Sequence, residues 1–164
     1  MTPVGQLSRF VFAVGLAVLL PPVVASVASQ AEPDIAVVVH PEVSVDNLTR
    51  ADLRGILLGG QSSWPSGVRV ALLLRAPINR ERDAAVRDVC GMSEAQFRQH
   101  WIGLVFRSAT ATGPKIVYSH ELALDLVSLT PGAITLLEMP ITTKSVKVLK
   151  IDGKAPGQPG YSLK

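Results

Sequence analysis

The chain has 164 residues, a formal net charge of +3 and one cysteine. Its basic residues form no patch or stripe along the sequence, so nothing indicates nucleic acid as a partner. A single cysteine excludes an intramolecular disulfide, and His40, His100 and His120 stand at spacings that match no metal motif. We therefore expect no metal site and no cofactor.

The first residues have the pattern of a signal peptide. Arg9 precedes the unbroken apolar run Phe10–Leu20, and small residues follow, which favours cleavage after Ala28. Pro21 and the limited length of the apolar run argue against a membrane anchor. The sequence thus predicts a signal peptide over 1–28 and one nearly neutral domain over 29–164, periplasmic or secreted and without a membrane segment after cleavage.

The domain begins with alternating strand and helix signals. Ile35–His40 is a short β-branched run that predicts a buried strand. Thr49 and Asp52 form a capping-box pattern, which predicts a helix that ends at Gly59. The almost wholly apolar segment Val68–Leu74 then predicts a strand that is covered on both faces.

Two further helices are expected in the middle of the chain. The first runs from about Arg80 to Cys90, with Cys90 as a buried small hydrophobe in preference to a reactive thiol. The second starts at a Ser93 capping box and continues to about Phe106. Its apolar stripe predicts core packing in preference to a binding surface, and it consists of Phe97, Trp101, Leu104 and Val105.

The last third of the chain continues the alternation. We predict a loop over Ser108–Lys115, a strand over Ile116–Tyr118 and a helix over Glu121–Ser128 that is capped by Ser119. Two further strands follow over Ala133–Leu137 and Ser145–Ile151, and residues 152–164 form an extended tail. Leu122, Leu126 and Val127 are expected to face inward from this helix. Strands that alternate with helices predict a three-layer α/β fold with a mainly parallel sheet flanked by helices.

Several segments, taken together and in order, resemble a known family. Val37–Pro41, the helix segment through Ile56–Gly59, Trp64, Pro131–Ile134 and Lys147–Gly153 are similar to matching segments of phosphate-type periplasmic solute-binding proteins. The resemblance covers about Ile35 to Gly153 and implies the fold of one lobe of a type 2 periplasmic binding protein.

The resemblance also implies where a ligand would lie. Family members hold an oxyanion at a helix N-terminus that follows an Arg-x-x-Gly-Ser-Gly-Thr segment, and the corresponding stretch here is Arg75–Glu81. The arginine matches, whereas Pro77 removes a donor and Ile78 adds bulk where the family has small residues. Candidate ligand-binding residues are accordingly Arg75, Asn79 and Arg80, with weak binding expected.

Two functions remain open from the sequence. The first is an exported solute-binding module for phosphate or a related small oxyanion, with a transporter as its partner. The alternative is a ligand-free interaction module that docks a partner protein or a second copy of the chain. No nucleophile and base arrangement is recognisable, so we predict that the protein is not an enzyme.

Overall fold

The computed structural model of the chain describes residues 32–107 and 113–164, which belong to one compact unit. The predicted signal peptide and most of the predicted loop Ser108–Lys115 lie outside the described residues. Within those residues, no helix combines the length and apolar character that crossing a membrane requires.

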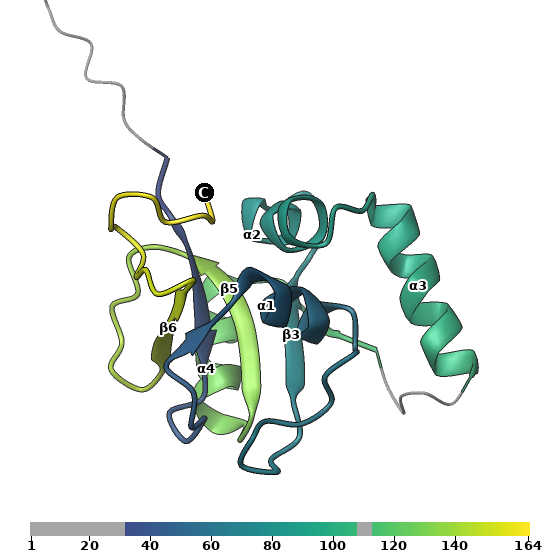
Figure 1. Cartoon of the computed structure of the whole chain (residues 1–164), viewed down its shortest axis with the longest axis horizontal. Coiled ribbons are helices and arrows are strands. Elements are labelled where there is room, and N and C mark those ends of the chain that lie inside the picture. The colour runs from purple at the N-terminus through teal and green to yellow at the C-terminus, as the bar shows by residue number, and fades with distance from the viewer. Residues whose placement is uncertain (1–31, 108–112) are drawn as a thin grey trace, which may run out of the picture. The chain divides into compact units, whose positions relative to one another are not determined.

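A six-stranded sheet forms the centre of the domain (Figure 1). Its strands are β1 (Ile35–Val39), β2 (Asn47–Leu48), β3 (Ala71–Arg75), β4 (Lys115–Val117), β5 (Ala133–Glu138) and β6 (Lys147–Ile151), in the spatial order β2-β6-β1-β5-β3-β4. β1 is antiparallel to both of its neighbours, β5 and β6, and the remaining pairs are parallel. Five strands therefore share one direction, and the prediction of a mainly parallel sheet is confirmed.

Apolar residues on both faces of the sheet produce the three layers. In β1, Ile35, Val37 and Val39 belong to one buried cluster, and Ala36 and Val38 belong to a second. The first cluster includes residues of α1 (Arg50–Leu57), of the segment Ala84–Val89 that continues α2 (Arg80–Asp83), and of α3 (Glu94–Phe106), whereas the second includes residues of α4 (His120–Leu129). Figure 1 shows α1 and α4 on opposite faces of the sheet. A strand covered on both faces needs apolar side chains at every position, which explains the continuous run in β1.

The predicted helix starts are confirmed in atomic detail. Thr49 accepts a hydrogen bond from the backbone N–H of Asp52 while the Asp52 side chain accepts one from the Thr49 N–H, and Ser93 and Gln96 make the same reciprocal pair at α3. Ser119 caps α4 through the N–H of Leu122. These caps satisfy backbone donors that a helix start leaves without partners.

The predicted helix from Arg80 to Cys90 has two parts. After α2 the chain continues as the π-helix η1 (Ala84–Val89), in which the N–H of Cys90 donates to the carbonyl of Ala85 five residues earlier. Cys90 is buried, as predicted, and its burial raises the pKa of the thiol to about 11.

Two expectations about the fold need correction. β3 begins at Ala71, not Val68, because the preceding residues pair back onto the segment around Trp64 through a bridge between Ser63 and Arg69. In α4, Leu122 is 44% exposed, and Ala123 instead faces inward beside Val127.

The tail completes the core of the domain. Tyr161 and Leu163 are buried, and the Tyr161 hydroxyl donates to the carbonyl of Ile35 over 2.8 Å. The N–H of Ile35 in turn donates to the carbonyl of Leu163 over 3.2 Å. These two contacts hold the last residues of the chain against the start of β1.

Candidate functional site

The segment from the end of β3 to the start of α2 carries the three residues predicted to bind an anion. Arg75 is the last residue of β3, Asn79 is the N-cap residue of α2, and Arg80 is its first residue. All three therefore lie in the short segment where β3 ends and α2 begins. Their side chains make separate contacts within the protein.

Arg75 is directed into the protein and is only 8% exposed. Its Nη1 donates to the carbonyl of Val117 over 3.3 Å, and its Nε lies 3.5 Å from a carboxylate oxygen of Glu81, which is also buried. The Nε makes no hydrogen bond within the described residues. The positive charge of Arg75 is thus balanced by a carboxylate six residues away.

Arg80 is more accessible but is also paired. Its guanidinium contacts the carboxylate of Glu138 in β5, lies 3.3 Å from a carboxylate oxygen of Glu32, and donates to the carbonyl of Pro33 over 3.1 Å. About a third of its side chain remains exposed. An incoming anion would have to compete with two carboxylates of this chain for the same guanidinium.

Asn79 does not act as a side-chain cap for α2. Its Nδ2 donates instead to the carbonyl of Ala76 over 2.8 Å, which closes the loop between β3 and α2. Within that loop Ile78 has a φ of +74° and is 99% exposed. A β-branched residue in the left-handed region is strained, and Pro77 contributes no N–H donor, so the loop lacks the donor-rich backbone that would wrap an oxyanion.

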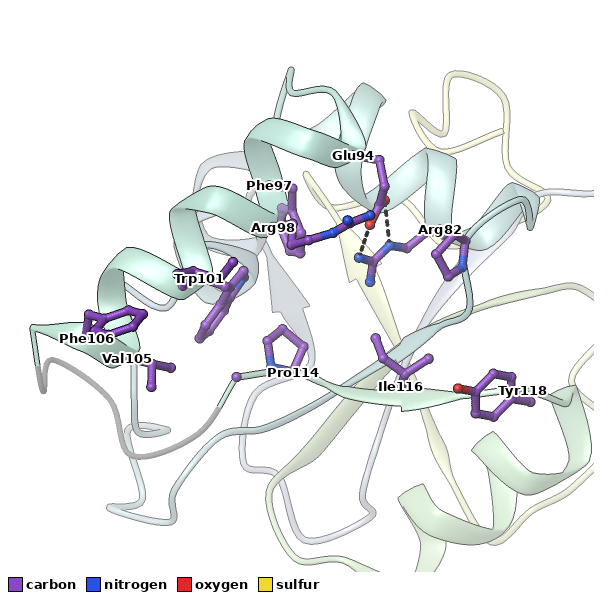
Figure 2. Close-up of a pocket in the computed structure, with 13 residues that line it drawn as sticks. Arg82, Glu94, Phe97, Arg98, Trp101, Val105, Phe106, Pro114, Ile116 and Tyr118 are labelled. Atoms are coloured by element: carbon purple, nitrogen blue, oxygen red, sulfur yellow. Dashed lines mark hydrogen bonds and ion pairs between the residues drawn. The ribbon is translucent and has the colours of Figure 1, made fainter.

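An apolar cavity of about 490 Å³ lies next to this segment, between α3 and the start of β4 (Figure 2). Pro77, in the loop between β3 and α2, is one of the lining residues, and the other walls come mainly from α3 and from the segment around β4. The apolar and aromatic lining consists of Phe97, Trp101, Ile102, Val105, Phe106, Pro114, Ile116 and Tyr118. Phe106 and Tyr118 are mostly exposed, so the cavity opens to solvent.

One end of this cavity is polar. Arg82 of α2 and Glu94 of α3 form a two-bond ion pair, with Nε to Oε2 at 3.0 Å and Nη2 to Oε1 at 2.6 Å. The guanidinium of Arg82 also lies 5.0 Å from the centre of the Phe97 ring. The hydrogen bonds from Arg82 lower the pKa of Glu94, partly offset by burial, so this carboxylate is ionised at neutral pH.

The apolar stripe of α3 divides between core and cavity. Phe97 and Trp101 are buried, and the indole N–H of Trp101 donates to the carbonyl of Leu57 over 3.2 Å, as the core interpretation predicted. Val105 is 41% exposed and lines the cavity, and both aromatic residues contribute to its wall. Sequence reasoning missed this second role because the opposite wall is formed by residues some ten or more positions further along the chain.

Neither a metal centre nor a catalytic arrangement emerges from these contacts. Within the part of the chain that the structure describes, no group of three or more His, Cys, Asp or Glu side chains is placed to hold a metal ion. Near the loop and the cavity, Arg75, Arg80 and Arg82 are each paired with a carboxylate, and Arg98 is an additional charged residue of the cavity lining. The chemistry offered is recognition by charge and by apolar contact.

Comparison with solved structures identifies the fold. A phosphate ABC-type transport receptor from Vibrio cholerae has a TM-score of 0.64 and 21% identity over 81% of this chain and 54% of that chain. A protein described as a phosphate ABC transporter substrate-binding protein from Clostridium perfringens, solved with bound phosphate, has a TM-score of 0.62 and 19% identity over 77% of this chain and 48% of that chain. For PstS from Borrelia burgdorferi the TM-score is 0.60 and the identity 17%, over 77% and 50%.

These likenesses confirm at the level of the fold the resemblance inferred from the sequence. The chain spans about half the length of the solved structures it matches. No family model and no curated protein matches the sequence. The described domain therefore has a fold found in substrate-binding proteins of transporters, and its own ligand has to be argued from its residues.

Proposed function

We propose that the protein is an exported solute-binding-like domain that binds phosphate or a related small oxyanion weakly and does not catalyse a reaction. The observation that carries this proposal is the likeness of its fold to substrate-binding proteins, one of which was solved with bound phosphate. In this proposal residues 1–28 are removed on export, the domain acts in the periplasm or outside the cell, and a transporter is its partner.

The proposed anion position is the loop between β3 and α2. Arg80 supplies the accessible positive charge, Asn79 lies beside it, and Arg75 adds a buried positive charge behind them. The carboxylates of Glu81 and Glu138 already neutralise the two arginines. Charge-assisted bonds at a solvent-exposed edge are weakened by the high dielectric of water. We therefore expect a dissociation constant no tighter than about millimolar, or roughly 4 kcal/mol.

Phosphate titration at low salt, followed by calorimetry and NMR, tests this position. Arg80→Gln should abolish the signal, because it removes the accessible guanidinium. Arg87→Gln is the matched control, since Arg87 is 71% exposed and pairs with Asp83 in the same helical segment. Glu138→Gln should tighten binding several-fold, because it releases Arg80 from its carboxylate partner in β5.

The outcomes separate the alternatives. A millimolar signal that Arg80→Gln removes and Arg87→Gln keeps would support the proposal. Absence of any phosphate signal in both the parent protein and Glu138→Gln would refute the anion function.

A second candidate function rests on a different observation. Phe106 is 85% exposed and Tyr118 is 77% exposed, and both lie at the rim of the apolar cavity. Exposed large apolar residues that gather at one place are typical of protein interaction sites. The alternative is therefore a module that docks a partner protein or a second copy. Native mass spectrometry of the purified protein tests self-association, since a stable pair would appear at twice the monomer mass.

A further inference from the structure

The apolar cavity has the size and composition of a small-molecule site. Its volume of about 490 Å³ falls within the range of roughly 300–1,000 Å³ that is usual for such sites. Aromatic and branched aliphatic side chains form its walls, and Figure 2 shows the charged residues Arg82, Glu94 and Arg98 together at one end. This distribution fits a ligand with an apolar body and one polar end.

The charges at the polar end do not cancel. Arg82, Glu94 and Arg98 all line the cavity, and together they carry one net positive charge. Glu94 is engaged by Nε and Nη2 of Arg82, which leaves Arg98 as an exposed positive group beside the pair.

Arg82 provides the second observation. Its side chain is 6% exposed, and its Nη1 makes no hydrogen bond within the described residues. Buried donors without a partner are rare, because leaving one unsatisfied costs free energy. Figure 2 shows the guanidinium of Arg82 reaching from α2 to the end of the cavity that Glu94 and Arg98 also occupy. This end of the cavity therefore carries a buried guanidinium whose donors the described part of the protein does not fully satisfy.

We propose that the cavity binds a small monocarboxylate whose body is aromatic or branched aliphatic. The apolar body contacts Phe97, Trp101 and Val105, and the carboxylate lies at the end formed by Arg82 and Arg98. This site shares no residue with the proposed oxyanion position at Arg75, Asn79 and Arg80, so the two proposals stand or fall separately.

Other ligand classes fit the cavity less well. Inorganic phosphate has no apolar body, so it would lose hydration against aromatic walls without gaining apolar contact. A purely apolar ligand would lie against the charged end without offering an acceptor to Arg82 or Arg98. A carboxylate with an apolar body satisfies both parts of the cavity.

The indole N–H signals of the two tryptophans provide a direct test by NMR. Trp101 lines the cavity, whereas Trp64 does not line it and donates to the carbonyl of Gly132 in another part of the core. Titration of the purified, ¹⁵N-labelled protein with 3-phenylpropanoate should shift the Trp101 signal saturably, with a dissociation constant of about 1 mM or below. The Trp64 signal should stay in place, and inorganic phosphate should not compete.

Matched variants separate the two parts of the site. Val105→Trp should abolish binding, because Val105 is partly exposed and the larger side chain fills the cavity. Leu129→Trp, on exposed Leu129 of α4, is the control for added bulk.

Arg98→Gln should weaken binding of the carboxylate by about two- to fivefold, as expected for an exposed charge pair, and should leave binding of 3-phenylpropanamide unaffected. Arg107→Gln, on the exposed C-cap residue of α3, is the control for lost charge.

Three results would overturn the proposal. The first is a Trp101 signal that 3-phenylpropanoate does not move. The second is equal binding of the acid and the amide, which would remove the argument from charge. The third is a Trp101 signal whose position changes with protein concentration in the parent protein but not in Val105→Trp. That result would show that a second copy of the chain occupies the cavity.

Discussion

Gly132 is the position at which a single added methyl group should damage the fold most clearly. It follows Pro131 in the turn before β5 and has a φ of +75°, in the left-handed region. A Cβ built on Gly132 would lie 2.1 Å from the carbonyl oxygen of Arg69 and 2.9 Å from a Val68 methyl carbon. The closest contact is with backbone, which cannot rotate away as a side chain can.

The cost of Gly132→Ala can be assembled from these contacts. The left-handed conformation alone costs about 1–2 kcal/mol for a residue with a Cβ. Relief of the overlap would move the carbonyl of Gly132, which accepts hydrogen bonds from the indole of Trp64 at 2.9 Å and from the N–H of Ala71 at 3.1 Å. Each lost bond contributes about 1 kcal/mol. We expect Gly132→Ala to lower the free energy of unfolding by about 3 kcal/mol.

Urea unfolding, followed by circular dichroism, measures this loss. With a slope of about 1–3 kcal/mol/M, a loss of 3 kcal/mol moves the midpoint by about 1 M or more. Gly153→Ala is the matched control, because Gly153 has a φ of +80° and nothing lies within 4 Å of the added Cβ. It should lose only about 1 kcal/mol. Equal midpoint shifts in the two variants would show that the close approach of Arg69 to Gly132 does not exist.

Two further predictions concern titratable groups. Arg82 holds the pKa of Glu94 below its ordinary value, so the ionised carboxylate stabilises the fold above about pH 4.3 and that contribution is lost as pH falls through the lowered pKa. Glu94→Gln should therefore lower the free energy of unfolding by about 2 kcal/mol at pH 7 and by progressively less below pH 4. A difference in urea midpoint between the variant and the parent protein that does not change with pH would contradict this. Burial raises the pKa of Cys90 to about 11, so iodoacetamide at pH 8 should alkylate the folded protein at least about 100-fold more slowly than the protein in urea. Mass spectrometry measures the two rates, and equal rates would place this thiol at the surface.

Local signals were sufficient to place most of the helices and strands. The reciprocal bonds at Thr49 and Ser93 involve residues only three positions apart, so the sequence displays all of the partners. The apolar runs Ile35–His40 and Ala133–Leu137 predicted two strands, which the structure places at Ile35–Val39 and Ala133–Glu138, and such runs arise because both faces of the sheet are covered. The tail gave no such signal, because Tyr161 and Leu163 are buried only through contact with a strand more than a hundred residues earlier.

The candidate sites were less accessible to sequence reasoning. The sequence placed Arg75, Asn79 and Arg80 between the end of a strand and the start of a helix, and in the structure they lie at the end of β3 and the start of α2. It did not reveal that Glu138, from β5, reaches Arg80, because that pairing depends on the alignment of distant segments. The cavity between α3 and β4 was missed for the same reason.

The sequence by itself determined the alternation of strands and helices, the helix caps and the turn at Gly132, because each depends on neighbours within a few positions. Only the tertiary structure decided which charges are neutralised and which are left over. Arg75 and Arg80 receive carboxylate partners, whereas Arg82, Glu94 and Arg98 retain one net positive charge beside an apolar cavity. Ion pairs and cavities form where separate elements meet, and the chain order does not specify those distances.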